Sequence, residues 1–221
     1  MKQVNSVGLI PDGNRRWAIK SNISLDKAYI ITMKRIAVVC DEVFKLGSSV
    51  FCVYLLSSNN LIRPRDDLAS VINSENYFIQ DLLPPLATKW NANVYMCGTN
   101  SSPVNGLYSS FDNIFSNWNV DTRSRGIYLC VGYDPVDELK YAFARNPNLI
   151  DGDIIEYLSV PIRLDMVIRT SGEFRLSNFL PLQAGYAELF FLKKYFPDIS
   201  RIDIRQVYKR FSENRIRRYG R

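Results

Sequence analysis

The sequence feature that most constrains the fold is the alternation of short apolar runs, rich in β-branched and aromatic residues, with longer stretches of helical period. Apolar runs of this kind are typical of strands that are buried on both faces of a sheet. Because parallel strands need a long crossover between them, the alternation indicates an α/β fold with a mainly parallel sheet. The runs predict six strands, at 6–10, 48–56, 92–98, 126–132, 165–170 and 187–191.

The stretch between the first two strands has the clearest helical pattern. Ser24 is a suitable N-cap, apolar residues recur every three or four positions from Leu25 onward, and Gly47 ends the helix. Nothing in the chain resembles a linker between two cores, so we expect a single domain over 1–221. Further helices are predicted at 66–85, 107–117, 135–145, 152–159 and 203–216.

The composition excludes several classes of chemistry. The four cysteines are widely spaced inside apolar runs and predict buried free thiols rather than a zinc site or disulfides. The chain has no histidine, which excludes histidine-dependent triads and the usual transition-metal sites. No apolar run reaches the roughly 18 residues of a membrane span, and the N-terminus is short and polar. We therefore expect a cytoplasmic protein without a transmembrane segment.

The net charge of +6 is confined to the end of the chain. Residues 201–221 contain eight Arg or Lys against two acidic residues, and the rest of the chain is neutral. Such a tail is typical of binding to nucleic acid, an anionic membrane surface or a phosphorylated ligand, and also of a solvated helix face. Beyond Tyr208, Phe211 and Tyr219 it lacks interleaved aromatics, and it has no known nucleic-acid-binding motif, so we expect no nucleic-acid partner.

Polar and basic residues gather just after three of the predicted strands, in "PDGNRRW", "SSNNLIRP" and "RTSGEFRLSN". Ligands bind at the carboxyl ends of the strands in open parallel sheets, and arginine forks match phosphate oxygens. Several arginines on three loops therefore predict a site for more than one phosphate group, with Asp12 holding Mg²⁺ that bridges them. The predicted rim consists of Asp12, Asn14, Arg15, Arg16, Ser57, Ser58, Asn59, Asn60, Arg63, Arg169, Arg175 and Ser177.

The same blocks carry a family resemblance. "PDGNRRWA", "SSNNLIRP", "DMVIRTSGEFRLSNFLPLQAGYAELFF" with "FPD" after it, and the terminal "ENRIRRYG" resemble the signatures of the cis-prenyltransferases, the undecaprenyl diphosphate synthase family. The likeness runs in order along nearly the whole chain. It implies a homodimeric α/β enzyme with a hydrophobic tunnel, bound Mg²⁺, and two subsites for prenyl diphosphate substrates such as dimethylallyl and isopentenyl diphosphate.

The resemblance also implies roles for individual residues. Asp12 matches the catalytic, Mg²⁺-binding aspartate, Asn60 matches an asparagine that takes part in the chemistry, and Glu188 matches a carboxylate linked to Mg²⁺. Arg217 and Arg218 would reach towards the partner subunit's site. The residues that match substrate contacts are Gly13, Asn14, Arg15, Arg16 and Trp17 at the allylic diphosphate, Ser57, Ser58 and Arg63 in the second motif, and Arg169, Arg175 and Ser177 at the second diphosphate.

Chemistry of this kind needs no histidine. Mg²⁺ and arginines stabilise the departing diphosphate, an allylic cation forms, and the double bond of a second five-carbon diphosphate attacks it. The resulting tertiary cation is a strong acid, so a diphosphate oxygen or a water held by Asn60 suffices to take its proton.

The sequence departs from the family pattern around the first subsite. The family has an arginine and then a Gly-His pair where this chain has Leu25, Ala28 and Tyr29. Asn59 replaces a glutamate, Leu61 replaces a tryptophan, and "GYDPVDE" replaces a Gly-Gly-Arg segment. Two diphosphate contacts are therefore missing. Sequence drift or a catalytically silent partner subunit would also give such changes, but Asp12, Asn60 and Arg63 are in place.

"PDGxRRW" followed by "SLDxxY" is similar to the lavandulyl and cyclolavandulyl diphosphate synthases, which join two dimethylallyl diphosphates head to middle. A small product also fits the polar residues at 73–76, which interrupt the apolar face of the predicted tunnel helix. The alternatives are regular head-to-tail elongation with isopentenyl diphosphate and a non-catalytic subunit of a heteromeric prenyltransferase.

Overall fold

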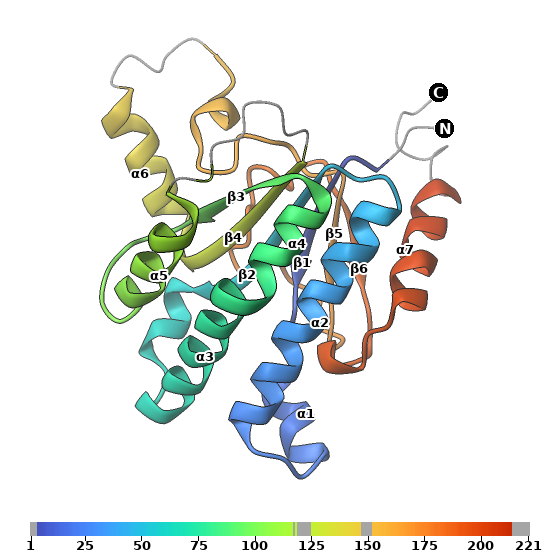
Figure 1. The fold of residues 1–221 in the computed structure, drawn as a ribbon. Coiled ribbons are helices and arrows are strands. Elements are labelled where there is room, and N and C mark those ends of the chain that lie inside the picture. Colours follow the sequence, from blue (N-terminus) through green and yellow to red (C-terminus); the bar gives the residue numbers. More distant parts are fainter. Residues whose placement is uncertain (1–3, 117, 119–124, 147–151, 214–221) are drawn as a thin grey trace.

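A computed structural model of the chain describes residues 4–116, 118, 125–146 and 152–213, and these residues form a six-stranded sheet (Figure 1). Every neighbouring pair of strands is parallel, and the spatial order is β3-β4-β2-β1-β5-β6. The predicted fold class and all six strands are confirmed. The strands are β1 (Ser6–Ile10), β2 (Val50–Ser57), β3 (Ala92–Cys97), β4 (Arg125–Tyr133), β5 (Met166–Arg169) and β6 (Glu188–Phe191).

The strand order brings the three predicted loops to one place. β1 lies between β2 and β5, with Leu9 opposite Val53 on one side and Ile10 opposite Arg169 on the other. All five residues of β1 are buried, as expected for a central parallel strand. Because the three strands are parallel, their carboxyl ends meet at the same edge of the sheet. The sheet order reverses here, and open α/β sheets bind ligands at such a point.

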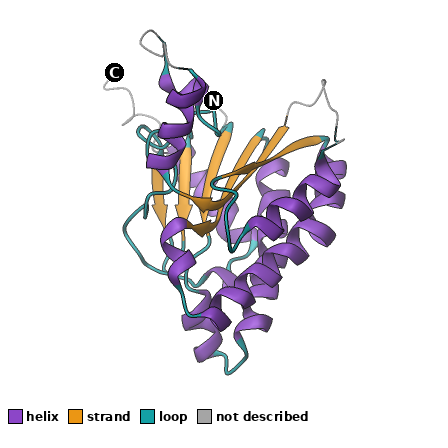
Figure 2. Ribbon diagram, turned by 90° about the vertical axis from the view of Figure 1, so that its left-hand side faces the viewer, coloured by secondary structure: helices purple, strands orange, loops and turns teal. Residues whose placement is uncertain are grey.

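Helices cover one face of the sheet, and mainly irregular chain covers the other (Figures 1 and 2). The helices are α1 (Asn14–Lys20), α2 (Leu25–Lys45), α3 (Arg65–Tyr77), α4 (Leu83–Trp90), α5 (Asn105–Phe115), α6 (Pro135–Arg145) and α7 (Arg201–Glu213), with 3-10 turns η1 (Ser58–Ile62), η3 (Ile154–Tyr157) and η4 (Phe196–Asp198) and a π turn η2 (Phe78–Leu82). The larger buried cluster joins the strands to α2, α3, α4, α5 and α7. On the opposite face, Val160, Leu164, Phe179 and Leu180 pack against the strands.

Helix α2 forms as the sequence predicts. The Ser24 hydroxyl accepts a hydrogen bond from the backbone N–H of Lys27 at 3.4 Å, and the helix ends before Gly47, whose φ of 94° favours glycine. The side chains at steps of three and four along α2 are buried against the sheet. This long helix therefore provides one wall of the space beneath the three loops.

Three other helical predictions need correction. Residues 14–20, which the sequence leaves as part of a turn, form helix α1. The single helix predicted at 66–85 runs through α3, η2 and α4 to Trp90, and it widens to a π turn because Pro84 and Pro85 cannot donate to the preceding turn. The helix predicted at 152–159 is only the short turn η3. The predicted helix at 203–216 is α7, and its last residues lie outside the described part of the chain.

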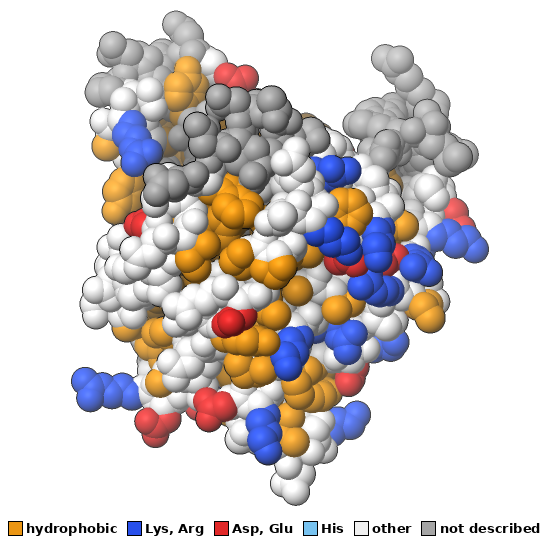
Figure 3. All heavy atoms as spheres, viewed as in Figure 1, with side chains coloured by type: hydrophobic (Ala, Val, Ile, Leu, Met, Phe, Trp, Pro, Cys, Tyr) orange, Lys and Arg blue, Asp and Glu red, His pale blue; other side chains and the backbone are white. Residues whose placement is uncertain are grey.

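Two buried carboxylates on α2 anchor the C-terminal helix. Asp41 accepts from Lys89 at 2.5 Å and pairs with Arg201 at 2.8 Å, while Glu42 accepts from Arg201 at 2.8 Å and Arg205 at 2.6 Å. Figure 3 shows Lys and Arg side chains gathered over this region with acidic atoms between them. Burial alone would raise both carboxyl pKa values, but the hydrogen bonds from these cations outweigh it, and the pKa of each lies below its ordinary value.

This cluster predicts a specific acid sensitivity. A carboxyl group whose pKa is lowered on folding stabilises the protein above its unfolded pKa, and that contribution is lost as pH falls through the folded pKa. We therefore expect the free energy of unfolding to fall steeply below about pH 4. The double variant Asp41→Asn, Glu42→Gln should show a shallower fall when urea unfolding is measured at a series of pH values from 5 down to 2. Equal slopes for the two proteins would contradict this assignment.

Candidate active site

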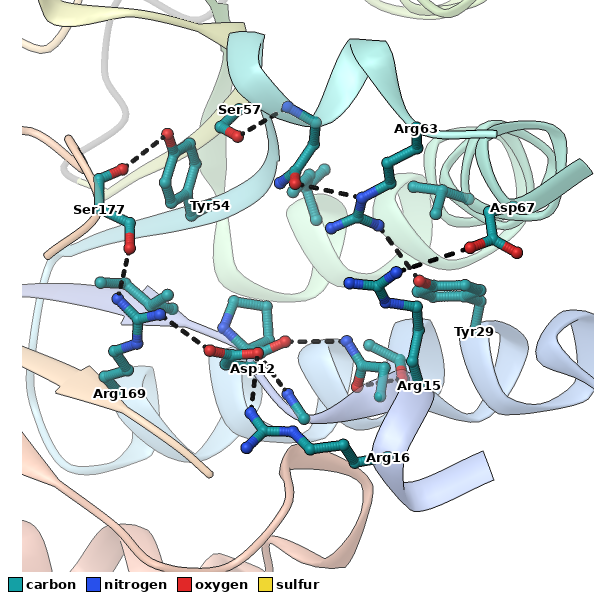
Figure 4. Close-up of a pocket in the computed structure, with 18 of the residues that line it drawn as sticks. Asp12, Arg15, Arg16, Tyr29, Tyr54, Ser57, Arg63, Asp67, Arg169 and Ser177 are labelled. Atoms are coloured by element: carbon teal, nitrogen blue, oxygen red, sulfur yellow. Dashed lines mark hydrogen bonds and ion pairs between the residues drawn. The ribbon is translucent and has the colours of Figure 1, made fainter. Parts of the chain in front are cut away.

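A cavity of about 990 Å³ opens at the carboxyl ends of β1, β2 and β5 (Figure 4). Most of the residues predicted from the sequence line it, although they come from three separate loops. Those that line the cavity are Asp12, Gly13, Asn14, Arg15, Arg16, Ser57, Asn59, Asn60, Arg63, Arg169, Arg175 and Ser177. The parallel order of the strands thus assembles the predicted anion-binding rim.

The turn after β1 depends on a glycine. Gly13 has a φ of 100°, and a Cβ atom there would lie 2.6 Å from Tyr195 and 2.9 Å from the Cβ of Ser171. Both the backbone conformation and the close approach exclude a side chain. Helix α1 begins at the next residue and carries Arg15 and Arg16 on its first turn. The sharp turn therefore places Asp12 and both guanidinium groups at the cavity.

Asp12 is the centre of an electrostatic network. Its Oδ2 accepts from Arg169 Nη2 at 2.8 Å, its Oδ1 accepts from the Gly13 N–H at 2.6 Å, and Arg16 Nη2 lies 3.7 Å away. The Arg169 side chain is only 5% exposed, and its Nη1 also donates to Ser177 Oγ at 2.9 Å and to the Arg175 carbonyl. Arg169 therefore ties the loop after β1 to the loop after β5.

The loop after β5 has a constrained backbone. Ser177 and Asn178 have φ values of 51° and 65°, in the left-handed region that costs non-glycine residues of the order of 1 kcal/mol or more. Tyr54 of β2 donates to the Ser177 carbonyl at 3.2 Å, and its ring stacks on Phe179 with centroids 5.0 Å apart. Tyr54 thus holds this loop against the sheet, a role that no sequence signal assigned to it.

The second loop forms a linked set of polar groups. Ser57 Oγ accepts from the Asn60 N–H at 3.2 Å, Asn60 Oδ1 accepts from Arg63 Nε at 3.1 Å, and Arg63 Nη1 donates to the Tyr29 hydroxyl at 3.3 Å. Burial raises the pKa of Tyr29, and the positive charges of Arg63 and Arg15 oppose that shift. Tyr29 is therefore a neutral phenol in the cavity wall.

Two carboxylates that the sequence reasoning missed face the rim arginines. Asp67 lies 3.6 Å from Arg15, and Glu173 pairs with Arg16 at 2.9 Å and also with Arg175. Glu173 is buried enough to raise its pKa, but Arg175 and Arg16 reverse this and lower it. Both carboxylates pair with guanidinium groups that a bound diphosphate would contact. Spacing alone gives no signal for Glu173, because Arg16 comes beside it only in the folded chain.

Three predicted site residues do not line the cavity. Trp17 donates from Nε1 to Asp198 at 2.8 Å, and Ser58 donates to Asp134 at 3.2 Å, so both side chains turn away to neighbouring elements. Glu188 is the first residue of β6 and lies opposite Met166, the first residue of β5. Arg169, the last residue of β5, lies opposite Phe191 at the other end of β6. Three strand residues span about 10 Å, so a single chain does not bring Glu188 to Asp12. Trp17 and Ser58 thus have protein partners in this structure, and Glu188 lies apart from Asp12 within one chain. The substrate and metal roles predicted for these residues stay predictions.

Comparison with known proteins agrees with the geometry of the site. A family model described as putative undecaprenyl diphosphate synthase matches residues 10–220. The chain belongs to this prenyltransferase family. Over almost the whole length of both proteins it is similar to the isoprenyl transferase of Streptococcus thermophilus (28% identical, 98% of this chain and 92% of the relative). It is equally similar to the tritrans,polycis-undecaprenyl-diphosphate synthase (GGDP specific) of Sulfolobus acidocaldarius (28% identical, 97% and 87%).

Solved structures share the prenyltransferase fold. Lavandulyl diphosphate synthase from Lavandula x intermedia, solved with dimethylallyl diphosphate, superposes with a TM-score of 0.86 at 20% identity, covering 95% of each chain. A probable undecaprenyl diphosphate synthase from Campylobacter jejuni superposes with a TM-score of 0.76 at 22% identity, covering 96% of each chain. At these identities the two structures show a shared fold and do not assign a substrate to this chain. The chain is thus a prenyltransferase by family. The fold alone does not distinguish head-to-middle from head-to-tail coupling.

No helix in the described ranges is both long enough and apolar enough to span a lipid bilayer.

The cavity residues fit a Mg²⁺ ion that is held jointly by the protein and the substrate. Among the described residues, no group of three His, Cys, Asp or Glu side chains is placed to hold a metal ion by itself. Asp12 nevertheless presents a carboxylate, with a side chain 30% exposed, between arginines that suit phosphate oxygens. Mg²⁺ is often held by one or two carboxylates together with substrate phosphates. The donor set therefore fits a metal ion that enters with the diphosphate.

Proposed function

We propose that the chain joins two molecules of dimethylallyl diphosphate head to middle, giving a branched or cyclised ten-carbon diphosphate of the lavandulyl type. The observation that carries this proposal is the cavity wall formed by Leu25 and Tyr29. The regular members that the sequence resembles have an arginine and a histidine at these positions. Exchanging a guanidinium for an isobutyl group removes a diphosphate contact and adds apolar surface. The changed wall favours a second hydrocarbon group near the reacting centre.

The bond changes of this reaction balance without a further reactant. The C1–O bond of one dimethylallyl diphosphate breaks, and its electron pair leaves with the diphosphate. The C2–C3 double bond of the second molecule attacks the allylic C1, which forms the new C1–C2 bond and leaves a tertiary cation at C3. Loss of a methyl proton gives the branched C10 diphosphate, inorganic diphosphate and one proton.

The arginines supply the electrostatic part of the reaction. Arg169 and Arg16 flank Asp12 and present donors where negative charge develops on the departing diphosphate. Donors fixed before the reaction stabilise such charge without reorganising. Asp12 would hold Mg²⁺ together with the diphosphate oxygens. When bound, Mg²⁺ supplies charge neutralisation at the leaving group.

The proton leaves without an imidazole. A tertiary cation next to a methyl group is a very strong acid, so even a weak base accepts its proton. The departing diphosphate is one such base, and a water held by the Asn60 side chain, which also binds Arg63, is another. The absence of histidine from the sequence is compatible with this step.

The proposal is tested by product analysis. The purified chain is incubated with Mg²⁺ and dimethylallyl diphosphate alone, and in parallel with isopentenyl diphosphate added. We expect a branched C10 diphosphate from dimethylallyl diphosphate alone, identified by mass spectrometry and NMR. A linear product that forms only when isopentenyl diphosphate is present would contradict head-to-middle coupling.

Regular head-to-tail elongation is the second candidate, because the full-length relatives are named isoprenyl transferases. It predicts the linear product in the experiment above. A non-catalytic subunit would make no product from C5 to C15 allylic diphosphates, yet would activate an added partner chain.

We propose a homodimer built on the edge of the sheet at β6. Phe174, Tyr186 and Leu189 lie 75%, 97% and 42% exposed around this edge strand. Exposed apolar groups at an unpaired edge are typical of an interface. The predicted reach of Arg217 and Arg218 into the partner's site lies outside the described residues. Sedimentation of the purified enzyme at the mass of one chain would contradict the dimer.

A further inference from the structure

We propose that Thr170 is a positioning residue for Asp12, which it holds by the main chain. The proposal rests on the proposed function, in which Asp12 holds Mg²⁺ together with a substrate diphosphate. The Thr170 hydroxyl accepts a hydrogen bond from the backbone N–H of Asp12 at 2.9 Å and donates to the backbone carbonyl of Asp12 at 2.8 Å. One side chain thus bridges both main-chain polar groups of the proposed metal ligand.

The Thr170 contact forms where the pairing of β1 with β5 ends. Ile10 and Arg169 are the last pair of the two strands, and Pro11 follows Ile10 without a backbone N–H. The Asp12 N–H turns back to the Ile10 carbonyl at 3.0 Å and also reaches the Thr170 hydroxyl. Thr170 is 0% exposed, so water does not compete for these hydrogen bonds. A buried side chain therefore continues the connection between the strands beyond the end of their backbone pairing.

Two consecutive residues of the chain hold the side chain and the main chain of Asp12. Arg169 donates to its carboxylate Oδ2 at 2.8 Å, and the Gly13 N–H donates to Oδ1 at 2.6 Å (Figure 4). A metal ion would bind the same two oxygens, so these hydrogen bonds compete with it. The hydrogen bonds of Thr170 involve neither oxygen, and they persist when a cation binds. Thr170 therefore keeps Asp12 in place while metal and diphosphate enter, as contacts behind a metal ligand commonly do.

The amino end of β1 carries a comparable contact far from the cavity. Ser6 Oγ donates to the Arg163 carbonyl at 2.8 Å and accepts from the Asp165 N–H at 2.9 Å, which links β1 to the segment before β5. Ser6 is also buried, at 1% exposed. Four strand steps, or about 13 Å, separate it from Ile10, which lines the cavity. Removing the Ser6 hydroxyl therefore weakens the connection of the same two strands without changing the site.

Binding of an unreactive analogue tests the proposal without relying on turnover. Isothermal titration calorimetry measures the affinity of the full chain for dimethylallyl thiolodiphosphate at a series of Mg²⁺ concentrations. The variants are Thr170→Val, which keeps the shape of the side chain but loses the hydroxyl, Thr170→Ser, which keeps the hydroxyl, and Ser6→Ala as the matched control. Initial rates with dimethylallyl diphosphate and urea unfolding are measured on the same preparations.

We expect Thr170→Val to need about tenfold more Mg²⁺ for half-maximal analogue binding and to lower kcat by about tenfold, the change that corresponds to one lost buried hydrogen bond. Thr170→Ser should bring both values back to within about twofold of the wild type, because it restores the hydroxyl. Ser6→Ala should unfold at a lower urea concentration, as Thr170→Val does, yet keep the wild-type Mg²⁺ requirement and kcat. If Thr170→Val does not fold, as judged by its thermal transition, the same comparison is made on Thr170→Ala.

Three results would overturn the role of Thr170. They are a wild-type Mg²⁺ requirement in the valine or alanine variant, an equal rise in Thr170→Ser, and an equal rise in Ser6→Ala, which would assign the effect to a general loosening of β1. If the wild type shows no Mg²⁺-dependent binding of the analogue, the proposed function fails as well. If the wild type shows such binding and the valine variant leaves it unchanged, the proposed function stands and only the role of Thr170 fails.

Discussion

Replacing Asp12 with alanine is expected to lower kcat by about 10³-fold while leaving the fold intact. The carboxylate is the group in the cavity best placed to hold Mg²⁺ against a diphosphate, and such charge stabilisation contributes several kcal/mol to the transition state. Its removal also leaves Arg169 and Arg16 without their shared acidic partner. The measurement is product formation from dimethylallyl diphosphate at saturating Mg²⁺.

Asp12→Asn is the matched control, because the amide keeps the size of the side chain and an oxygen that can accept from Arg169. If the carboxylate binds metal, this variant should be nearly as inactive as the alanine variant at low Mg²⁺, with a raised Mg²⁺ requirement. Activity in Asp12→Asn close to that of the wild type, at all Mg²⁺ concentrations, would show that Asp12 acts only by positioning Arg169.

Replacing Arg169 with alanine is expected to lower kcat/KM by about 10²- to 10³-fold, the range seen when one fixed transition-state donor is removed. Arg169 holds Asp12 and Ser177 in place at 2.8 Å and 2.9 Å and is almost completely buried. Its removal deprives both loops of their common partner, so the free energy of unfolding should also fall, by about 1 to 3 kcal/mol. Initial rates and urea denaturation on the same preparation check the two effects.

Arg169→Lys and Ser177→Ala separate the two roles of Arg169. Lysine keeps the charge but lacks the planar fork that reaches both partners, so it should recover stability better than activity. Ser177→Ala removes the hydrogen bond between Arg169 and the loop after β5, and it should raise KM more than it lowers kcat. Wild-type kcat/KM in Arg169→Ala would place the diphosphate away from the junction of β1 and β5.

Much of the site was predictable because parallel α/β sheets obey a simple rule. A loop that follows a buried parallel strand lies at the ligand-binding edge, so "PDGNRRW" and "RTSGEFRLSN" could be assigned to one site from their positions alone. Arg63 and Asn60 followed from the same rule applied to β2. The strands were predictable for a related reason, since strands buried on both faces leave unbroken apolar runs.

The differences between the predicted and the observed positions have physical causes that spacing does not reveal. The turn-forming residues of "PDGN" hid helix α1, which begins directly after Gly13 and packs on α2. Trp17 was assigned to substrate, yet its indole donates to Asp198, a residue far along the chain. Glu188 was assigned to the metal, but its place at the amino end of β6 is set by pairing with Met166. The contacts of Trp17 and of β6 join segments that are separated along the chain.

The sequence alone specified the α/β fold, the family and the anion-binding loops, because strand periodicity, turn chemistry and short motifs are local properties. Only the tertiary structure decided which groups share a partner. It placed Glu173 between Arg16 and Arg175, and Tyr54 under the Ser177 loop. These electrostatic and packing relations depend on the positions of helices and loops in space. They arise when the sheet brings separate loops together, which no pattern along one segment encodes.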